Sequence, residues 1–184
     1  METYYKEYKP PSTIQNLTMD MVKQDKKYPK LRAKGAETRH LVPFGYILAQ
    51  NLYDTHQTTQ NMTLKNLMFN LLGFYSCMAQ EPFQHEVAGA RCRKTLLLYK
   101  ALSDEAAATN QTLWKCKPKM HMWQELAEHM TEHVGNPQDF WCYKDEDFVG
   151  FISELAHSRG GGSIASMVPT TVLDRCRAPS QQAL

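Results

Sequence analysis

The feature that most constrains the fold is a run of apolar residues with helical spacing between positions 62 and 80. The apolar positions repeat at i, i+3, i+4 and i+7, and they are Leu64, Leu67, Met68, Leu71, Leu72, Tyr75 and Met78. Residues with this spacing share one face of an α-helix, and in a globular protein such a face is turned toward the core. The run therefore predicts a core helix.

Five other segments also have helical patterns. One helix is predicted to begin at Ser12 or Thr13, whose hydroxyl can cap free N–H groups. Another covers about 33–53, where Pro43 should kink or restart the helix because proline removes a backbone donor. The remaining three cover about 84–108, 118–134 and 145–158. No stretch has a convincing β pattern, so the chain is predicted to be mostly α, with room for a short extended segment near 113–117.

The spacing of apolar residues also predicts which faces of two later helices are buried. In the helix of about 84–108, the residues expected to point inward are Val87, Ala90, Leu97, Leu98, Ala101 and Leu102. In the helix of 118–134, they are Met122, Trp123, Leu126, Ala127, Met130 and Val134. The sequence Gly135-Asn136-Pro137 should end the second helix. Both faces are expected to contribute to the core.

The domain organisation follows from length and from the two ends of the chain. A chain of 184 residues fits one domain of ordinary size. Residues 1–11 end in two prolines and are predicted to form an extended arm. Residues 12–177 are predicted to form a single helical domain, and residues 178–184 a disordered tail.

The net charge of +2 is too small to indicate nucleic-acid or membrane binding by itself. The basic excess is local, because residues 1–40 carry nine Lys or Arg against five acids. This stretch suits a phosphate-facing surface, and it equally suits a solvated helix face with a loop. Any nucleic-acid hypothesis therefore depends on local patches.

The five cysteines are scattered without a CxxC pair, and an odd number argues against a disulfide framework. We therefore expect reduced and mostly buried thiols. The N-terminal residues lack the apolar run of a signal peptide, and no apolar segment approaches the roughly 18 residues that span a bilayer. The expectation is a soluble intracellular protein, nuclear or cytoplasmic, with no membrane partner.

Three basic residues cluster in the first half of the helix of about 84–108: Arg91, Arg93 and Lys94. They could bind phosphate, and they could instead form surface ion pairs. A second basic group, Lys117, Lys119 and His121, opens the next helix around Pro118. Backbone N–H groups at a helix start attract anions, so this group is a candidate for contact with phosphate.

Two patterns could hold a metal ion. In the first pattern, every fourth residue is polar and able to bind a metal: His121, Glu125, His129 and His133. Two histidines at i and i+4 can hold Zn²⁺, although an ordinary polar helix face has the same pattern. Asp145 and Glu146 open the helix of 145–158, where acids either cap the helix or bind Mg²⁺. Mg²⁺ is accordingly the cofactor that the acids suggest.

Several of these segments resemble the C-terminal part of DDE-type transposases with a ribonuclease-H-like core. The likeness is to elements of the hAT and Kyakuja-Dileera-Zisupton kind, and to uncharacterised transposon-like proteins of protists. It covers roughly residues 30–158. The segments that carry it are Lys30 to His40 (KLRAKGAETRH), the Arg93 to Leu102 helix, Lys117 to His121 (KPKMH) and Asp145 to Gly150 (DEDFVG).

The resemblance implies that Glu146 matches the last metal-binding carboxylate, with Lys117, Lys119 and His121 nearest the DNA backbone. In such enzymes two further aspartates lie on strands before the helical insertion, and this chain, which starts with helices, lacks that half. The resemblance thus implies a truncated, transposase-derived domain that contacts DNA without a complete active site.

Two alternative functions stay open from the sequence. One is a helical protein-interaction or scaffold protein, which could bind a partner or a second copy of itself. The other is a small metal-dependent nuclease that uses Glu146 with other acids.

Overall fold

The computed structural model describes residues 1–14, 17–22 and 28–139. The chain divides into two units, Met1–Phe140 and Trp141–Leu184, and all the described residues belong to the first. The predicted tail of 178–184 and the predicted helix of 145–158 lie outside the described residues. The elements are α1 (Glu2–Tyr8), α2 (Met19–Val22), α3 (Gly35–His40), α4 (Val42–Thr55), α5 (Thr59–Met78), α6 (His85–Ala108), α7 (Pro118–Glu125), η1 (Leu126–Met130), α8 (Thr131–Val134) and η2 (Pro137–Asp139).

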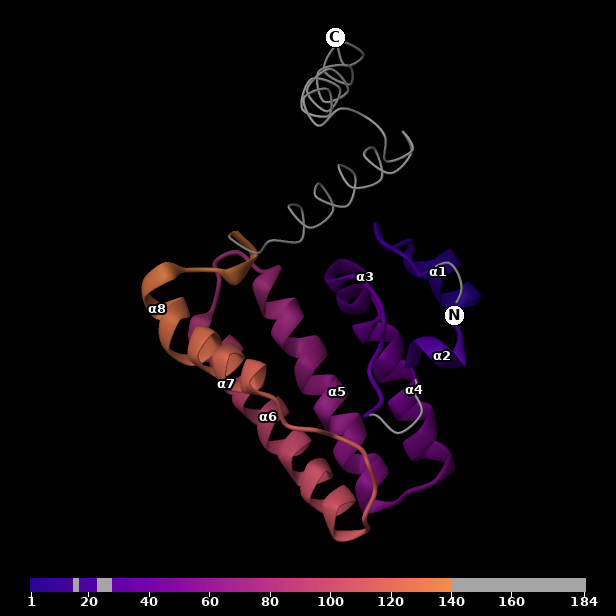
Figure 1. Cartoon of the computed structure of the whole chain (residues 1–184). Coiled ribbons are helices and arrows are strands. Elements are labelled where there is room, and N and C mark those ends of the chain that lie inside the picture. Colours follow the sequence, from indigo (N-terminus) through magenta and orange to yellow (C-terminus); the bar gives the residue numbers. More distant parts are fainter. Residues whose placement is uncertain (15–16, 23–27, 140–184) are drawn as a thin grey trace, which may run out of the picture. The chain divides into compact units, whose positions relative to one another are not determined.

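The described part of the chain is mostly α-helical and contains no strand, as the sequence predicts. Helix α5, the predicted core helix, lies between α4 and α6 and packs against both (Figure 1). Its start is fixed by Thr58, whose hydroxyl accepts a hydrogen bond from the Asn61 N–H at 3.1 Å. Its buried side chains include Leu67, Phe74 and Met78.

The restart predicted at Pro43 is confirmed. Helix α3 ends at His40, and α4 begins at Val42 with the proline in its first turn, where a missing N–H costs nothing. In the part of the chain that the structure describes, no helix is both long enough and apolar enough to cross a membrane.

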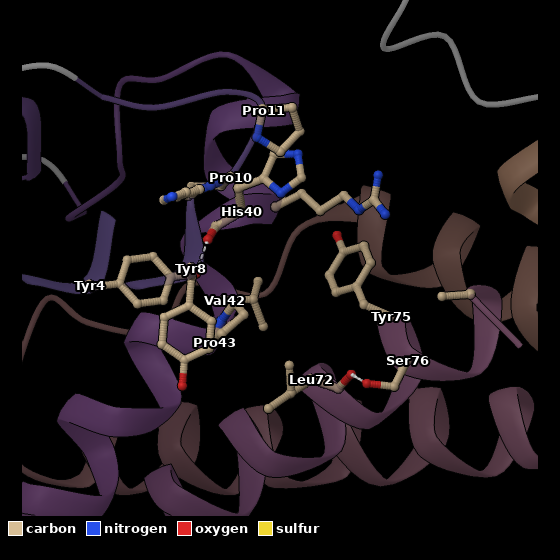
Figure 2. A pocket seen from close by; sticks show the side chains of 13 residues that line it. Tyr4, Tyr8, Pro10, Pro11, His40, Val42, Pro43, Leu72, Tyr75 and Ser76 are labelled. Carbon is tan, nitrogen blue, oxygen red and sulfur yellow. Dashed lines mark hydrogen bonds between the residues drawn. The ribbon is translucent and has the colours of Figure 1, made fainter. Parts of the chain in front are cut away.

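The N-terminal segment is a helix, so the prediction of an extended arm over residues 1–11 is wrong. Residues Glu2–Tyr8 form α1, and the two prolines follow it instead of interrupting it. Tyr4 holds α1 in place, because its hydroxyl donates a hydrogen bond to the His40 carbonyl at 2.7 Å (Figure 2). Its ring centroid also lies 5.4 Å from that of Phe44 in α4. Tertiary packing of one aromatic residue therefore stabilises a helix that is too short to be stable alone.

The prediction of a helix start at Ser12 or Thr13 is also wrong. Residues 12–14 are not helical, and α2 begins at Met19. The buried residue there is Ile14, whose N–H donates to the Tyr5 hydroxyl at 3.1 Å. This contact with α1 takes the place of a helical hydrogen bond.

Helix α6 has the predicted boundaries, but it buries a different face from the predicted one. Of the predicted inward residues, Leu102 is buried, whereas Val87 and Leu97 are 40% and 64% exposed. The buried face consists of small or moderately sized residues: Ala88, Gly89, Cys92, Thr95, Leu102 and Ala106. A Cβ at Gly89 would lie 3.1 Å from the Ala127 carbonyl oxygen, so small residues are what lets the neighbouring backbone approach this closely.

The predicted helix of 118–134 is present as three successive pieces: α7, the π-helical turn η1 and α8. Its end at Gly135 is confirmed, where φ is 94°. Its inward face agrees with the prediction at Ala127, which is buried, but Met122, Met130 and Val134 are exposed and the unpredicted Thr131 is buried. The Thr131 hydroxyl donates to the Ala127 carbonyl at 3.0 Å, which satisfies a buried polar group.

The segment of 113–117 is not a strand. Trp114 has a φ of 54°, a left-handed conformation that turns the chain and is uncommon for a bulky residue. The indole meets the ring of Tyr99 edge-on, with the ring centroids 5.5 Å apart. The aromatic contact with α6 accompanies this turn at Trp114, while Lys117, just before α7, has the extended conformation expected from the sequence.

Candidate functional site

Two irregular segments that are far apart in the sequence meet next to helices α5, α6 and α7. They are residues 28–34, before α3, and residues 113–119, which lead into α7 and begin it. The ammonium of Lys115 lies 5.2 Å from the ring centroid of Tyr28, so the two segments touch. We refer to them together as the basic loops.

Both basic loops are held by hydrogen bonds to regular elements. In the first, the N–H groups of Lys30 and Arg32 donate to the carbonyls of Val22 and Met21, at 3.0 and 2.8 Å. In the second, the hydroxyl of Tyr99 on α6 donates to the Lys115 carbonyl at 3.2 Å. Their backbones are therefore positioned by the helices, which is what a recognition surface requires.

The basic loops carry cations and no acid. The first contributes Lys30, Arg32 and Lys34, and the second contributes Lys115, Lys117 and Lys119; the side chains of all of them are exposed. A carboxylate nearby is that of Glu37, which accepts the Lys34 N–H at 2.8 Å. Every charged side chain of the basic loops is therefore a cation. Such a surface suits the binding of phosphate or another anion.

The basic loops border an apolar cavity of about 600 Å³. It is lined by both loops and by α3, α5, α6 and α7, through Pro29, Leu31, Thr38, Leu67, Met68, Leu71, Thr95, Leu96, Tyr99, Leu113, Trp114, Met120 and Trp123. Its volume lies in the range of about 300–1,000 Å³ that is typical of small-molecule sites. Most of its lining is apolar.

The predicted basic residues at the start of α7 belong to this surface. Lys117 precedes α7 and Lys119 lies in its first turn, in the same segment as Lys115, which contacts Tyr28 of the first basic loop. His121 is exposed, and its Nε2 lies 3.9 Å from Glu125 Oε1 on the next turn. The structure thus brings Lys117 and Lys119 together with cations that the sequence analysis did not join to them.

The cations predicted on α6 lie elsewhere and have other partners. Arg93 is bound to Glu128 of η1, with Nη2 to Oε2 at 2.8 Å and Nε to both carboxylate oxygens at 3.2 Å. Arg91 donates to Asn70 Oδ1 at 3.1 Å and stacks over Phe69, 5.0 Å from its ring centroid. Lys94 is exposed in a separate hollow of α5 and α6. The surface ion-pair interpretation therefore holds for Arg93.

The Arg93–Glu128 pair changes the chemistry of the groups beside it. The hydrogen bond from Arg93 lowers the pKa of Glu128 and raises that of Arg93, so both stay charged at neutral pH. Burial, with a further contribution from the Glu128 charge, raises the pKa of Cys92 to about 12. The Cys92 thiol is therefore not a nucleophile at neutral pH.

The thiols otherwise agree with the expectation of reduced cysteines. Among the described residues, Cys77 and Cys92 are buried, Cys116 is exposed, and all three are unpaired. Cys142 and Cys176 lie outside the described residues.

The metal hypotheses receive no support from residues 1–14, 17–22 and 28–139. Within these ranges no three His, Cys, Asp or Glu side chains lie close enough together to hold a metal ion, which includes the His121 to His133 series. Asp145 and Glu146, the acids proposed for Mg²⁺, lie outside the described residues.

A smaller hollow of about 340 Å³ lies where α1 meets the start of α4 and the end of α5. Figure 2 shows Tyr8, His40 and Tyr75 around it, with Pro10 and Pro11 at its edge. Burial, followed by the charge of Arg39, lowers the pKa of His40, so this imidazole is neutral at pH 7. Arg39 lies over the Tyr75 ring, 5.7 Å from its centroid. This contact joins α3 to α5.

Sequence reasoning missed the pairing of the two basic loops and the aromatic residues beside them. Lys30, Arg32 and Lys34 belonged to the basic stretch noted at the front of the chain, but Lys115 and Tyr28 were not selected. A usable signal existed, since residues 28–34 and 113–119 each contain three cations and no acid. Comparison with known proteins finds no family model that matches the chain, and no significant match to a curated protein or to a solved structure.

Proposed function

We propose that this domain binds the phosphate backbone of DNA through the basic loops. The observation that carries the proposal is the meeting of Lys30, Arg32 and Lys34 with Lys115, Lys117 and Lys119 on segments that contain no acid. Cations on two adjacent segments can contact successive phosphates, and backbone contacts of this kind supply most of the affinity in sequence-independent binding.

The geometry favours backbone contact over reading of bases. Lysines act as mobile point charges, whereas base readout in the major groove needs side chains such as Arg, Asn or Gln in fixed, bidentate positions. Five of the six cations are lysines on irregular segments or in the first turn of α7. We therefore expect affinity for DNA with little preference for sequence.

The test is the salt dependence of binding to labelled single- and double-stranded DNA, measured by fluorescence anisotropy. With six phosphate contacts, duplex affinity should fall about a thousandfold between roughly 50 and 200 mM salt. The slope of log affinity against log salt concentration, the salt slope, should become shallower by about 1.8 when two of the contacts that release counterions are lost. We expect this for Lys117→Gln/Lys119→Gln and equally for Lys30→Gln/Arg32→Gln.

A matched control is Lys6→Gln/Lys9→Gln, which removes the same charge from exposed positions in and just after α1. It should leave the slope unchanged. Equal slopes for all three double variants would show that only net charge matters, and absence of binding at low salt would reject the proposal.

The transposase origin suggested by the sequence stays a prediction, and strand cleavage is not part of the proposal. Three of the four segments that carry that resemblance fall on described residues, namely Lys30 to His40, the α6 segment and Lys117 to His121.

A second candidate function is self-association through the outer face of α6. This face carries Val87 and Leu97, which are 40% and 64% exposed, with Ala90 and Ala101 between and beyond them. The exposed Lys94 lies in the same row between Ala90 and Leu97, so the apolar residues flank a cation. Exposed apolar residues gathered on one side of a helix are a basis for contact with another chain. Sedimentation velocity should show a dimer that Leu97→Lys abolishes; a monomer at every concentration would reject this function.

A further inference from the structure

The cavity beside the basic loops has a lining that is apolar almost throughout. Its walls include Leu67 and Leu71 of α5, Leu96 of α6 and Trp123 of α7. Water in such a space finds few partners, so an apolar occupant is favoured over solvent.

The hydroxyl groups in the lining are engaged with the protein backbone. Thr38 donates to the Lys34 carbonyl at 3.0 Å, Thr95 to the Arg91 carbonyl at 2.8 Å and Tyr99 to the Lys115 carbonyl at 3.2 Å. Among the described residues, no buried side-chain nitrogen or oxygen lacks a hydrogen-bond partner. A nucleobase in the cavity would therefore leave several ring donors and acceptors unsatisfied, which is costly.

The edge of the cavity has the opposite character. Lys30 lies between the lining residues Pro29 and Leu31, and Lys115 directly follows the lining residue Trp114. Both lysines are exposed, and Lys115 lies over Tyr28, which precedes Pro29. Cations thus border an apolar space on two sides, an arrangement complementary to a molecule with an apolar body and one anionic end.

From this complementarity we infer that the cavity binds an amphiphilic monoanion, with a hydrocarbon chain inside and a carboxylate at Lys30 and Lys115. Fatty acids of medium to long chain are the ligands of this chemistry. The inference goes beyond DNA binding and does not depend on it, because it concerns the apolar interior and can be tested without nucleic acid.

The left-handed conformation of Trp114 is consistent with this role. Its indole contributes to the cavity wall and contacts Tyr99, at the cost of a backbone conformation that a bulky residue rarely adopts. The strain is thus located at the point where the apolar wall meets the basic edge.

The first experiment uses the full chain with Trp141→Phe, which leaves Trp114 and Trp123, both in the cavity wall, as the fluorescent tryptophans. A brominated dodecanoate should quench this fluorescence saturably, at concentrations below micelle formation. Competition by unbrominated acids then gives their affinities. Each added methylene should tighten binding about fourfold until the cavity is full.

The second experiment separates the anionic end from the chain. Dodecanol should bind more weakly than dodecanoate, and Lys30→Gln/Lys115→Gln should remove that difference while leaving dodecanol binding unchanged. Lys6→Gln/Lys9→Gln is the control and should preserve the difference. A Leu113→Trp variant, checked for folding by thermal unfolding, should shorten the longest chain that still gains affinity.

Three results of these two experiments would overturn the inference. The first is that no chain length quenches the fluorescence saturably, and the second is that the affinity does not depend on chain length. The third is that the protein with Lys30 and Lys115 intact binds dodecanol and dodecanoate equally well. Displacement of the bound chain by free nucleosides would assign the cavity to a nucleobase and would likewise reject it.

Discussion

The two faces of α6 are covered to different degrees, although the outer face, which also carries charged residues such as Lys94, contains large apolar side chains. The inner face presents Ala88, Gly89 and Cys92 to the rest of the domain and is buried, although it also contains Thr95. The outer face presents Val87 and Leu97, which are more apolar, and leaves them exposed. The comparison teaches that close approach of backbones, made possible by small residues, decides which face of this helix is covered.

Besides packing on α5, the inner face contacts η1 and α7. The Ala127 carbonyl lies where a Cβ at Gly89 would meet it at 3.1 Å, and the Cys92 thiol donates to the Trp123 carbonyl at 3.8 Å. Thr95 does not disturb this packing, because its hydroxyl is bonded to the preceding turn of its own helix. A polar residue can thus lie on a buried face when its hydrogen bond is made locally.

The largest expected effect is a difference between the two faces when the same substitution, leucine to alanine, is made on each. Leu102→Ala removes a side chain that is 1% exposed and should lower the free energy of unfolding by about 2–5 kcal/mol, through lost burial and the cavity left behind. Leu97→Ala, on the outer face, should change it by less than about 0.5 kcal/mol. Urea denaturation followed by circular dichroism measures both.

Equal losses for the two leucine variants would break the comparison, since they would mean that the outer face is also covered in solution. A loss for Leu97→Ala that grows with protein concentration would identify a second copy as the cover, in line with self-association.

A smaller effect is expected from adding volume to the inner face. Gly89→Leu places a side chain against the η1 backbone and should destabilise the domain by about 1–3 kcal/mol, despite the better helix propensity of leucine. Ala90→Leu is the control on the exposed side and should be neutral or slightly stabilising. If Gly89→Leu were tolerated as well as Ala90→Leu, α6 and η1 would not be in close contact.

Much of the fold could be predicted from local patterns. The core helix, the restart at Pro43 and the end at Gly135 follow from helical spacing and from the properties of proline and glycine. The buried face of α6 could not be predicted, because Gly89 and Cys92 carry a weaker hydrophobic signal than Val87 and Leu97. Their burial results from backbone contacts with η1 and α7, more than 30 residues away in the sequence.

The candidate site, too, could be predicted from the sequence only in part. Lys117 and Lys119 could be selected from sequence because they surround a proline at a helix start. Their junction with Lys30 depends on the Tyr28–Lys115 contact and on hydrogen bonds to α2, both of which arise from tertiary structure. For Arg93 the tertiary structure removes a candidate. Its charge made it a candidate for phosphate binding, but the carboxylate of Glu128, distant in sequence, binds it instead.

The smallest expected effect concerns that carboxylate, at the edge of the inner face. The Glu128 side chain is 7% exposed, and the bond from Arg93 holds the pKa of Glu128 below its usual value of 4.5. A lowered pKa in the folded state means that the carboxylate stabilises the fold above the unfolded pKa, and that this contribution disappears as pH falls through the folded pKa. Glu128→Gln should therefore cost on the order of 1 kcal/mol at pH 7, with the cost fading below pH 4.5.

The measurement is the difference in unfolding free energy between wild type and Glu128→Gln across this pH range. Glu125→Gln is the matched control, because its carboxylate is half exposed and lies 3.9 Å from His121 instead of being bound by an arginine. A pH-independent difference for Glu128→Gln would mean that packing alone matters at this edge, and the ion pair would then add nothing to the contact between α6 and η1. A difference that fades with acid would instead show that the Arg93–Glu128 ion pair stabilises the contact between α6 and η1 at this edge.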